Sequence, residues 1–265
     1  MRYRLYLFWQ LLRRDIESRY RGSTLGLLWP IVQPLMQLSV FTLIFFEFMQ
    51  FRWPLASGEH SQTAWEYAAQ VLGGLAAFNF FAELLNRSTI SISGQSNFVT
   101  KVRFPLGLLP TVCCAAAVLH IVTASLVLFI FRITMQGVSL EALLQLFWLP
   151  FLLAPFVLYG LSLSLVLGGL GVYFRDLQQV MPAITSLLMF LSPIFYPASS
   201  VPASLRSAFE LNPIGAAAEV LRHSFLATSE FHADTWIVHC LASGLIFFLS
   251  LSFFRRIRLG FADVL

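Results

Sequence analysis

Residues 143–170 read LLQLFWLPFLLAPFVLYGLSLSLVLGGL and include no charged side chain. A helix rises about 1.5 Å per residue, and the hydrocarbon core of a bilayer is about 30 Å thick. This stretch is therefore long enough to cross a bilayer as one helix. It carries nothing that would need water along its length, so it predicts a membrane-spanning helix.

The rest of the chain has the same apolar character. Apolar residues make up 58% of the 265 positions, charged residues only 11%, and the mean hydropathy is +0.76. Soluble domains carry about a quarter charged residues, so this chain has too few for a water-facing surface. We expect an all-α integral membrane protein with six transmembrane helices. Their predicted ranges are 27–51, 71–90, 106–131, 143–170, 180–195 and 236–254.

The basic residues predict the orientation of these helices. If both termini lie in the cytoplasm, the inside segments hold 13 of the 17 lysines and arginines. The opposite orientation would invert this bias, and basic residues favour the cytoplasmic side. We therefore predict a multi-pass protein of the bacterial inner membrane with cytoplasmic N- and C-termini. Topology explains the net charge of +4, so no nucleic-acid partner is expected.

The first 26 residues form a separate amphipathic segment. Its apolar stripe consists of Leu5, Phe8, Leu12, Ile16 and Tyr20. The pairs Arg13–Glu17 and Asp15–Arg19 are spaced to meet on one helix. This pattern predicts a helix lying in the cytoplasmic membrane interface, followed by the six-span domain over 27–260. A short cytosolic tail is the alternative.

The segment 196–235 is long but only weakly polar. Prolines interrupt it, and two short helices are expected at 202–211 and 214–227. Irregular backbone at membrane depth is tolerated only where protein or water surrounds it. We therefore predict re-entrant helices that form an outer gate. An ordinary surface loop is the alternative.

The sequence offers no catalytic motif. It contains no GxxxxGK[ST] phosphate loop and a single lysine, Lys101. The histidines are scattered and no CxxC occurs, so no metal site or disulfide is predicted. Glu47 and Glu83 lie within predicted spans, where acids are costly and often functional. Arg87, one turn from Glu83, also allows a purely structural pair.

Aromatic side chains gather on the predicted spans and could offer stacking surfaces to sugar rings. The candidates for such a path are Phe41, Phe45, Phe48, Phe78, Phe81, Phe190, Phe195 and Tyr196. Contact with lipid is the alternative for each of them.

Several short strings carry a resemblance to a known family. They are RDIESRYRGSTLG at 14–26 with LWP at 28–30 and QP at 33–34, VRFP at 102–105, YFRD at 173–176, and SPIFYP at 192–197 followed by LNP at 211–213. Together they resemble the permease subunits of type-2 ABC exporters of polysaccharides, the group that includes O-antigen, capsule and teichoic-acid exporters. The strings are ordered over nearly the whole chain.

The resemblance implies a transport subunit that is not an enzyme. Such permeases pair as homodimers and bind two copies of a separate ABC ATPase, which holds the ATP and magnesium. This chain would then need no cofactor. The implied substrate is a polysaccharide linked to polyprenyl diphosphate, such as an O-antigen, moved across the inner membrane.

Roles can be assigned to residues under this resemblance. The lipid diphosphate and the membrane interface would be contacted by Arg13, Arg14, Arg19 and Arg21. The ATPase would couple through Asn97, Phe98, Val99, Lys101 and Arg103. The outer gate would include Pro197, Asn212, Pro213 and Arg222.

A non-catalytic assembly subunit is one alternative that remains, and two further alternatives have a defined activity. One is the permease of a small-molecule or drug exporter from the same superfamily. The other is a membrane-embedded transferase acting on polyprenyl-linked sugars. A transferase would need clustered interfacial acids to hold a metal and phosphates. The acids predicted on the cytoplasmic side are dispersed: Asp15, Glu17, Asp176 and Asp263.

Overall fold

The computed structural model describes residues 2–20, 22–51, 53, 63–95, 97–100, 104–197, 200–226 and 232–265. Within these ranges the regular structure is helical, as predicted, and contains no strand. The helices are α1 (Arg2–Tyr20), α2 (Trp29–Thr42) with a π-helical extension (Leu43–Phe48), α3 (Ala64–Ser88), α4 (Asn97–Thr100), α5 (Leu108–Gln136), α6 (Leu140–Tyr173), α7 (Leu177–Leu191), α8 (Ala203–Glu210), α9 (Pro213–Leu226), α10 (Ala233–Ile257) and α11 (Phe261–Val264).

Five helical stretches of the described residues are long and apolar enough to cross a membrane. They are Trp29–Phe48, Ala64–Ser88, Leu108–Met135, Leu140–Tyr173 and Ala233–Val264. Each overlaps one predicted span. The remaining predicted span corresponds to α7, an apolar helix of only 15 residues. The count of six crossings therefore stays a prediction.

The predicted end of that span at 195 is wrong for the helix itself, because α7 stops at Leu191. Ser192 is extended, with φ −109° and ψ 145°. The reason is Pro193, whose ring disfavours helical geometry in the residue before it. The chain after α7 therefore continues as irregular backbone.

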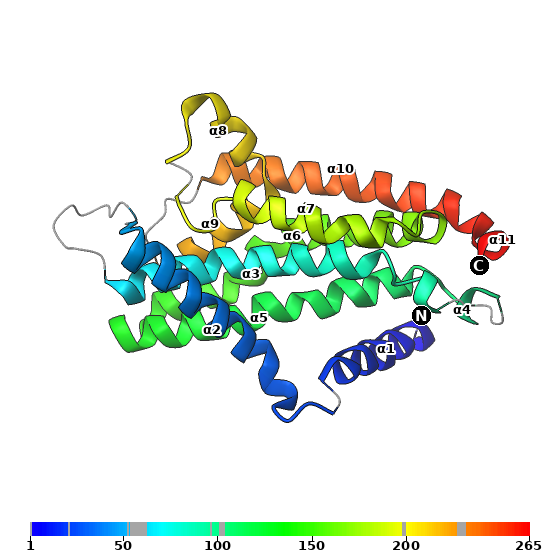
Figure 1. The fold of residues 1–265 in the computed structure, drawn as a ribbon, viewed down its shortest axis with the longest axis horizontal. Coiled ribbons are helices and arrows are strands. Elements are labelled where there is room, and N and C mark those ends of the chain that lie inside the picture. The colour runs from blue at the N-terminus through cyan, green and yellow to red at the C-terminus, as the bar shows by residue number, and fades with distance from the viewer. Residues whose placement is uncertain are drawn as a thin grey trace.

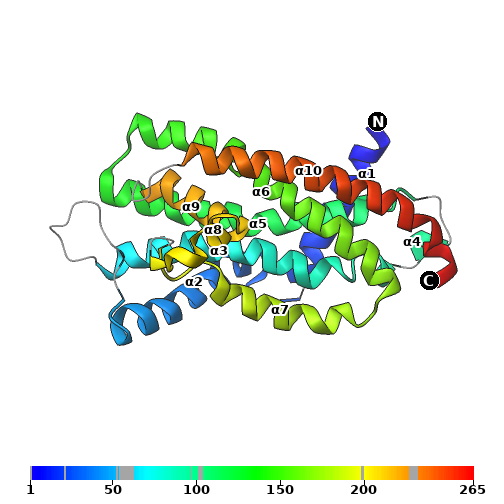
Figure 2. The same cartoon turned by 90° about the horizontal axis from the view of Figure 1, so that it is seen from above.

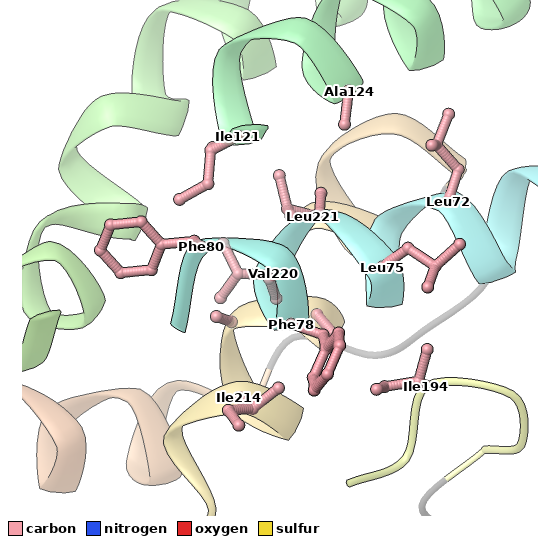
Figure 3. Close-up of a cluster of buried hydrophobic side chains, with 14 of the residues drawn as sticks. Leu72, Leu75, Phe78, Phe80, Ile121, Ala124, Ile194, Ile214, Val220 and Leu221 are labelled. Atoms are coloured by element: carbon pink, nitrogen blue, oxygen red, sulfur yellow. The ribbon is translucent and has the colours of Figure 1, made fainter. Parts of the chain in front are cut away.

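Helix α3 lies at the centre of the bundle (Figures 1 and 2), where it packs against α5, α6 and α9. Figure 3 shows apolar side chains of α3, including Leu72, Leu75 and Phe80, beside those of α5 and α9. Small residues allow close approach of helices. A Cβ on Gly171 of α6 would lie 1.9 Å from the carbonyl oxygen of Thr89.

Helix α3 begins earlier than the apolar run suggests, at Ala64 rather than near residue 71. Thr63 and Glu66 form a capping box, in which each side chain accepts a hydrogen bond from the backbone N–H of the other. These bonds satisfy amide groups that the first helical turn leaves without partners. The cap therefore extends the helix beyond its apolar part.

The start of α1, together with α4 and α11, lies at one end of the bundle, whereas α8 and α9 lie toward the other (Figures 1 and 2). The two short helices expected between 196 and 235 are present as α8 and α9. Most of α9 is buried against α3, α6 and α5. Its re-entry into a bilayer stays a prediction.

Helix α1 confirms the predicted N-terminal helix. It packs against α5 and buries Leu11, while Leu5 and Trp9 remain exposed. Large exposed apolar side chains beside arginines are typical of a helix at a membrane surface. Its position in such a surface is a prediction that its geometry does not test.

Candidate functional site

Three of the predicted path aromatics form one stacked cluster. Phe45, on the π-helical extension of α2, stacks on Phe195 with ring centroids 4.7 Å apart and planes 9° apart. The ring of Phe41 lies 4.5 Å from that of Phe195. Phe195 follows α7, so this cluster joins the first candidate span to the irregular segment after the short helix.

The backbone around Phe195 is held by polar side chains from elsewhere in the chain. The hydroxyl of Tyr67 donates to the carbonyl of Phe195 at 3.0 Å. The guanidinium of Arg222 donates to the carbonyl of Ile194 at 2.8 Å and to that of Gln70 at 3.0 Å. The bonds to Ile194 and Phe195 satisfy carbonyls that the irregular backbone would otherwise bury without a partner, and the bond to Gln70 joins Arg222 to α3.

Arg222, a predicted gate residue, is only 1% exposed. It also pairs with Glu219 at 3.0 Å, and its guanidinium lies 4.5 Å from the ring centroid of Trp53. A buried charge is tolerated only where it is paired and hydrogen-bonded. Arg222, which lies on α9, therefore links the segment after α7 to α3 through its hydrogen bonds.

The other predicted gate residues surround the same segment. The Asn212 side-chain amide donates to the Ser192 hydroxyl at 2.9 Å, and its oxygen accepts from the backbone N–H of Ile214 at 2.9 Å. Pro213 is the first residue of α9, where proline fits a helix start. Pro197 is buried and is the last residue of the described stretch 104–197.

The remaining path aromatics lie in different surroundings. Phe78 and Phe81 are buried in the core on α3, whereas Phe48 and Phe190 are exposed. The Tyr196 hydroxyl donates to the carbonyl of Phe190 at 3.0 Å. The structure thus brings together Phe41, Phe45 and Phe195 but not all eight, and a substrate role for any of them stays a prediction.

A buried charge cluster joins α1 to α3 and α5. Its members are Asp15, Arg19, Glu83, Arg87 and His120. Asp15 lies 2.7 Å from Arg19 and 2.8 Å from Arg87. Glu83 pairs with Arg19, with Arg87 at 3.1 Å and with His120 at 2.6 Å. Because the side chain of Glu83 is only 8% exposed, these partners compensate its burial.

The structure assigns different surroundings to the predicted lipid-facing arginines. Arg13 pairs with Glu17 at 2.6 Å and its side chain is 82% exposed; the hydrogen bond to Glu17 raises the pKa of Arg13. Arg19 is committed to the charge cluster. Arg14 donates to Gln95 at 3.0 Å. Arg21 lies outside the described residues.

The predicted coupling segment is only partly described. Asn97, Phe98 and Val99 lie on α4, and Val99 is described in its backbone alone. The ring of Phe98 stacks on Phe104 at 4.6 Å, and the Arg14 guanidinium lies 5.9 Å from it. Lys101 and Arg103 lie outside the described residues. Arg14 thus links α1 to this segment.

Sequence reasoning had not identified Tyr67, Gln70, Asp15 or His120 as members of these sites. The Tyr67 hydroxyl donates to a backbone carbonyl, and Gln70 contributes its own backbone carbonyl as an acceptor. No sequence motif marks such hydrogen bonds to the backbone. Asp15 could be found from its spacing to Arg19, but nothing in the sequence places His120 beside Glu83.

The sequence of this chain is similar to the sequences of known export and transport proteins. The O-antigen export system permease protein RfbA of Myxococcus xanthus is 28% identical over 72% of this chain and 68% of its own length. The protein of the same name from Klebsiella pneumoniae is 24% identical over 100% of this chain and 98% of its own length. The polysialic acid transport protein KpsM of Escherichia coli is 24% identical over 82% of this chain and 80% of its own length.

A family model described as ABC-2 type transporter matches residues 6–226. The match includes most of α1, the aromatic cluster, the charge cluster, α4 and both short helices α8 and α9. Since it covers most of the sequence, the chain belongs to the ABC-2 type transporter family.

Proposed function

We propose that this chain is the membrane-spanning permease subunit of an exporter that moves a polyprenyl-diphosphate-linked polysaccharide out of the cytoplasm. The observation that carries the proposal is the end-to-end similarity to a permease of O-antigen export, which spans 100% of this chain and 98% of the relative. The missing phosphate loop is consistent with a transport role in which a separate ABC ATPase binds ATP and magnesium.

The proposed topology has six crossings with both termini in the cytoplasm. Helix α7 would be about 22 Å long, shorter than the roughly 30 Å hydrocarbon core. Residues 192–197 would complete this crossing, surrounded by protein rather than lipid. The shared location of α1 and α11 at one end of the bundle supports an even number of crossings (Figure 1). Helix α9 would form the re-entrant part of the outer gate.

The proposed path runs along α2 and the segment after α7 at the axis of a homodimer. Helix α2 is the least buried of the five candidate spans, and α7 exposes Leu187 and Phe190. A second copy facing these helices would enclose a passage lined by Phe41, Phe45 and Phe195. Aromatic faces stack on the C–H faces of sugar rings without selecting one sequence of sugars, which suits a long polymer.

The proposed coupling element is α4, which would dock with one of two ATPase subunits. Phe98 contacts both Phe104 and Arg14, so force applied to α4 reaches α1. From α1 it reaches α3 through Asp15 and Arg87. A rigid-body shift of these helices is a known way to open a path across a membrane protein.

Deletion of the gene in its native host tests the function. We expect loss of surface polysaccharide and accumulation of lipid-linked polymer inside the cell, measured by immunoblot of whole and lysed cells. Complementation with Phe98→Ala should restore the protein to the membrane but not the surface polymer. Phe248→Ala is the control, because Phe248 is exposed on α10. Unchanged surface polysaccharide after deletion would contradict the proposal.

A further inference from the structure

A cavity of about 260 Å³ lies between α1, the turn after α3 and the start of α5. A water molecule occupies about 30 Å³ of liquid, so the cavity has room for roughly nine of them. That is enough for a headgroup but far too little for a whole lipid or a sugar polymer. The aromatic cluster contributes no residue to its lining.

The polar wall of the cavity carries an excess of positive charge. Among the described residues, Arg87 and Arg19 are shared by the carboxylates of Asp15 and Glu83. Arg14, which also lines the cavity, donates to the neutral side chain of Gln95. Of these groups, Arg14, Arg87 and Asp15 line the cavity, so two guanidinium groups and one carboxylate leave one net positive charge for a ligand.

The donors on this wall suit an anion with several oxygens. Arg14 presents a guanidinium group, which can bind phosphate in a forked geometry, whereas the Arg87 guanidinium already donates to Asp15 and Glu83. The side-chain oxygen of Gln95 accepts from Arg14, which leaves the Gln95 amide hydrogens to donate. Arg14 and Gln95 come from α1 and the turn after α3, so a bound anion would tie these two elements together.

Other lining side chains form an apolar wall. It is formed by Leu11, Ile90, Leu109 and Val112, of which only Ile90 is substantially exposed. A free inorganic anion would gain nothing from such a wall. A molecule with a phosphate at one end and carbon chain behind it would contact both walls.

We propose that this cavity binds the phosphate group of a membrane lipid, with Arg14 as the main donor and the apolar wall covering the first carbons behind the phosphate. The proposal rests on the proposed placement of α1 at the membrane surface, and it requires no transport. Two lipids share the chemistry: a phospholipid of the bilayer and a polyprenyl diphosphate carrier.

Native mass spectrometry of the purified protein in detergent tests the site with three probes. Dioleoylphosphatidylglycerol carries a phosphate, dioleoylglycerol lacks one, and farnesyl diphosphate represents the carrier. We expect saturable binding of the phosphate-bearing probes only. If farnesyl diphosphate displaces the phospholipid, the site takes the carrier; if the phospholipid is retained, the site holds a resident lipid. Both results support a phosphate site, and equal binding of dioleoylglycerol overturns it.

Paired variants locate the binding. Arg14→Gln should weaken it about tenfold, whereas Arg13→Gln should leave it unchanged because Arg13 is exposed and pairs with Glu17. Gly94→Phe should fill the cavity without touching a charge, since a Cβ at Gly94 meets no atom within 4 Å. Gly244→Phe is its control, with equally open surroundings on α10.

The outcomes of these variants are decisive. Equal weakening by Arg13→Gln would mean that the lipid is attracted to the charge of α1 in general. Unchanged binding in Gly94→Phe would mean that the lipid binds elsewhere. Either result overturns the proposal. Binding by the isolated protein needs neither ATPase nor export. A failed binding test therefore leaves the transport proposal standing, and a failed export test leaves this one standing.

Discussion

Replacing Arg222 with methionine should loosen the segment that carries Ile194 and Phe195. Arg222 is 1% exposed and donates to the carbonyls of Gln70 and Ile194 at 3.0 and 2.8 Å. Methionine has a comparable apolar length but donates no hydrogen bond. The variant would therefore remove one guanidinium hydrogen bond from each carbonyl and the ion pair with Glu219.

The magnitude follows from these contacts. A hydrogen bond to a charged group contributes about 1.5–3 kcal/mol, so the two bonds together contribute about 3–6 kcal/mol. Removing the buried guanidinium also removes the cost of its desolvation, which offsets part of the loss. We expect a net loss of about 3 kcal/mol. A change of 1.4 kcal/mol is tenfold in an equilibrium, so the open fraction of the segment should rise roughly 100-fold.

Thiol labelling measures this opening. Ile194 is 0% exposed, so Ile194→Cys in a Cys240→Ser background should react slowly with a maleimide. Adding Arg222→Met should accelerate the reaction by about two orders of magnitude. Adding Arg206→Met should not, because Arg206 is exposed on α8. Equal rates in the two variants would refute the idea that Arg222 holds this segment.

Three further predictions follow from other contacts. Asp15→Asn should lower the free energy of unfolding in detergent by about 1–3 kcal/mol, because Asp15 pairs with two arginines and its side chain is only 24% exposed. Glu17→Gln is the control and should lower it by less than about 0.5 kcal/mol, because Glu17 belongs to an exposed pair. Gly171→Leu should abolish a monodisperse peak in size-exclusion chromatography, because its Cβ would overlap the backbone of Thr89, the residue that follows α3. Combining Phe41→Ala with Phe45→Ala should shorten the exported polymer on gels, and an unchanged length distribution would remove the stacking role.

The interiors of the long helices could be predicted from sequence, but several of their ends could not. Apolar runs with few charged residues located all five candidate spans. Their limits depend on features that hydropathy ignores. The capping box of Thr63 and Glu66 lengthens α3, and Pro193 cuts α7 short although the apolar run continues.

The charge cluster was predictable only within single helices. The pairs Asp15–Arg19 and Glu83–Arg87 follow from i,i+4 spacing, and both are confirmed. The contact between these two ion pairs, one on α1 and one on α3, depends on how the helices pack. The position of His120 beside Glu83 depends on the same packing. The aromatic cluster was also predictable only in part. The spacing of Phe41 and Phe45 places both rings on one face of a helix, but it does not reveal which ring from elsewhere in the chain covers that face.

That covering ring is Phe195, which already occupies the stacking surface of Phe41 and Phe45. On the proposed path, an arriving sugar would exchange with a phenyl group instead of entering empty space. Aromatic contacts of this kind are worth only about 0.5–1.5 kcal/mol each, so the exchange is nearly balanced. A small ion or a water molecule has no apolar face to offer in return. The protein would thus remain sealed by a group that only a polymer with stacking faces can replace, one unit at a time.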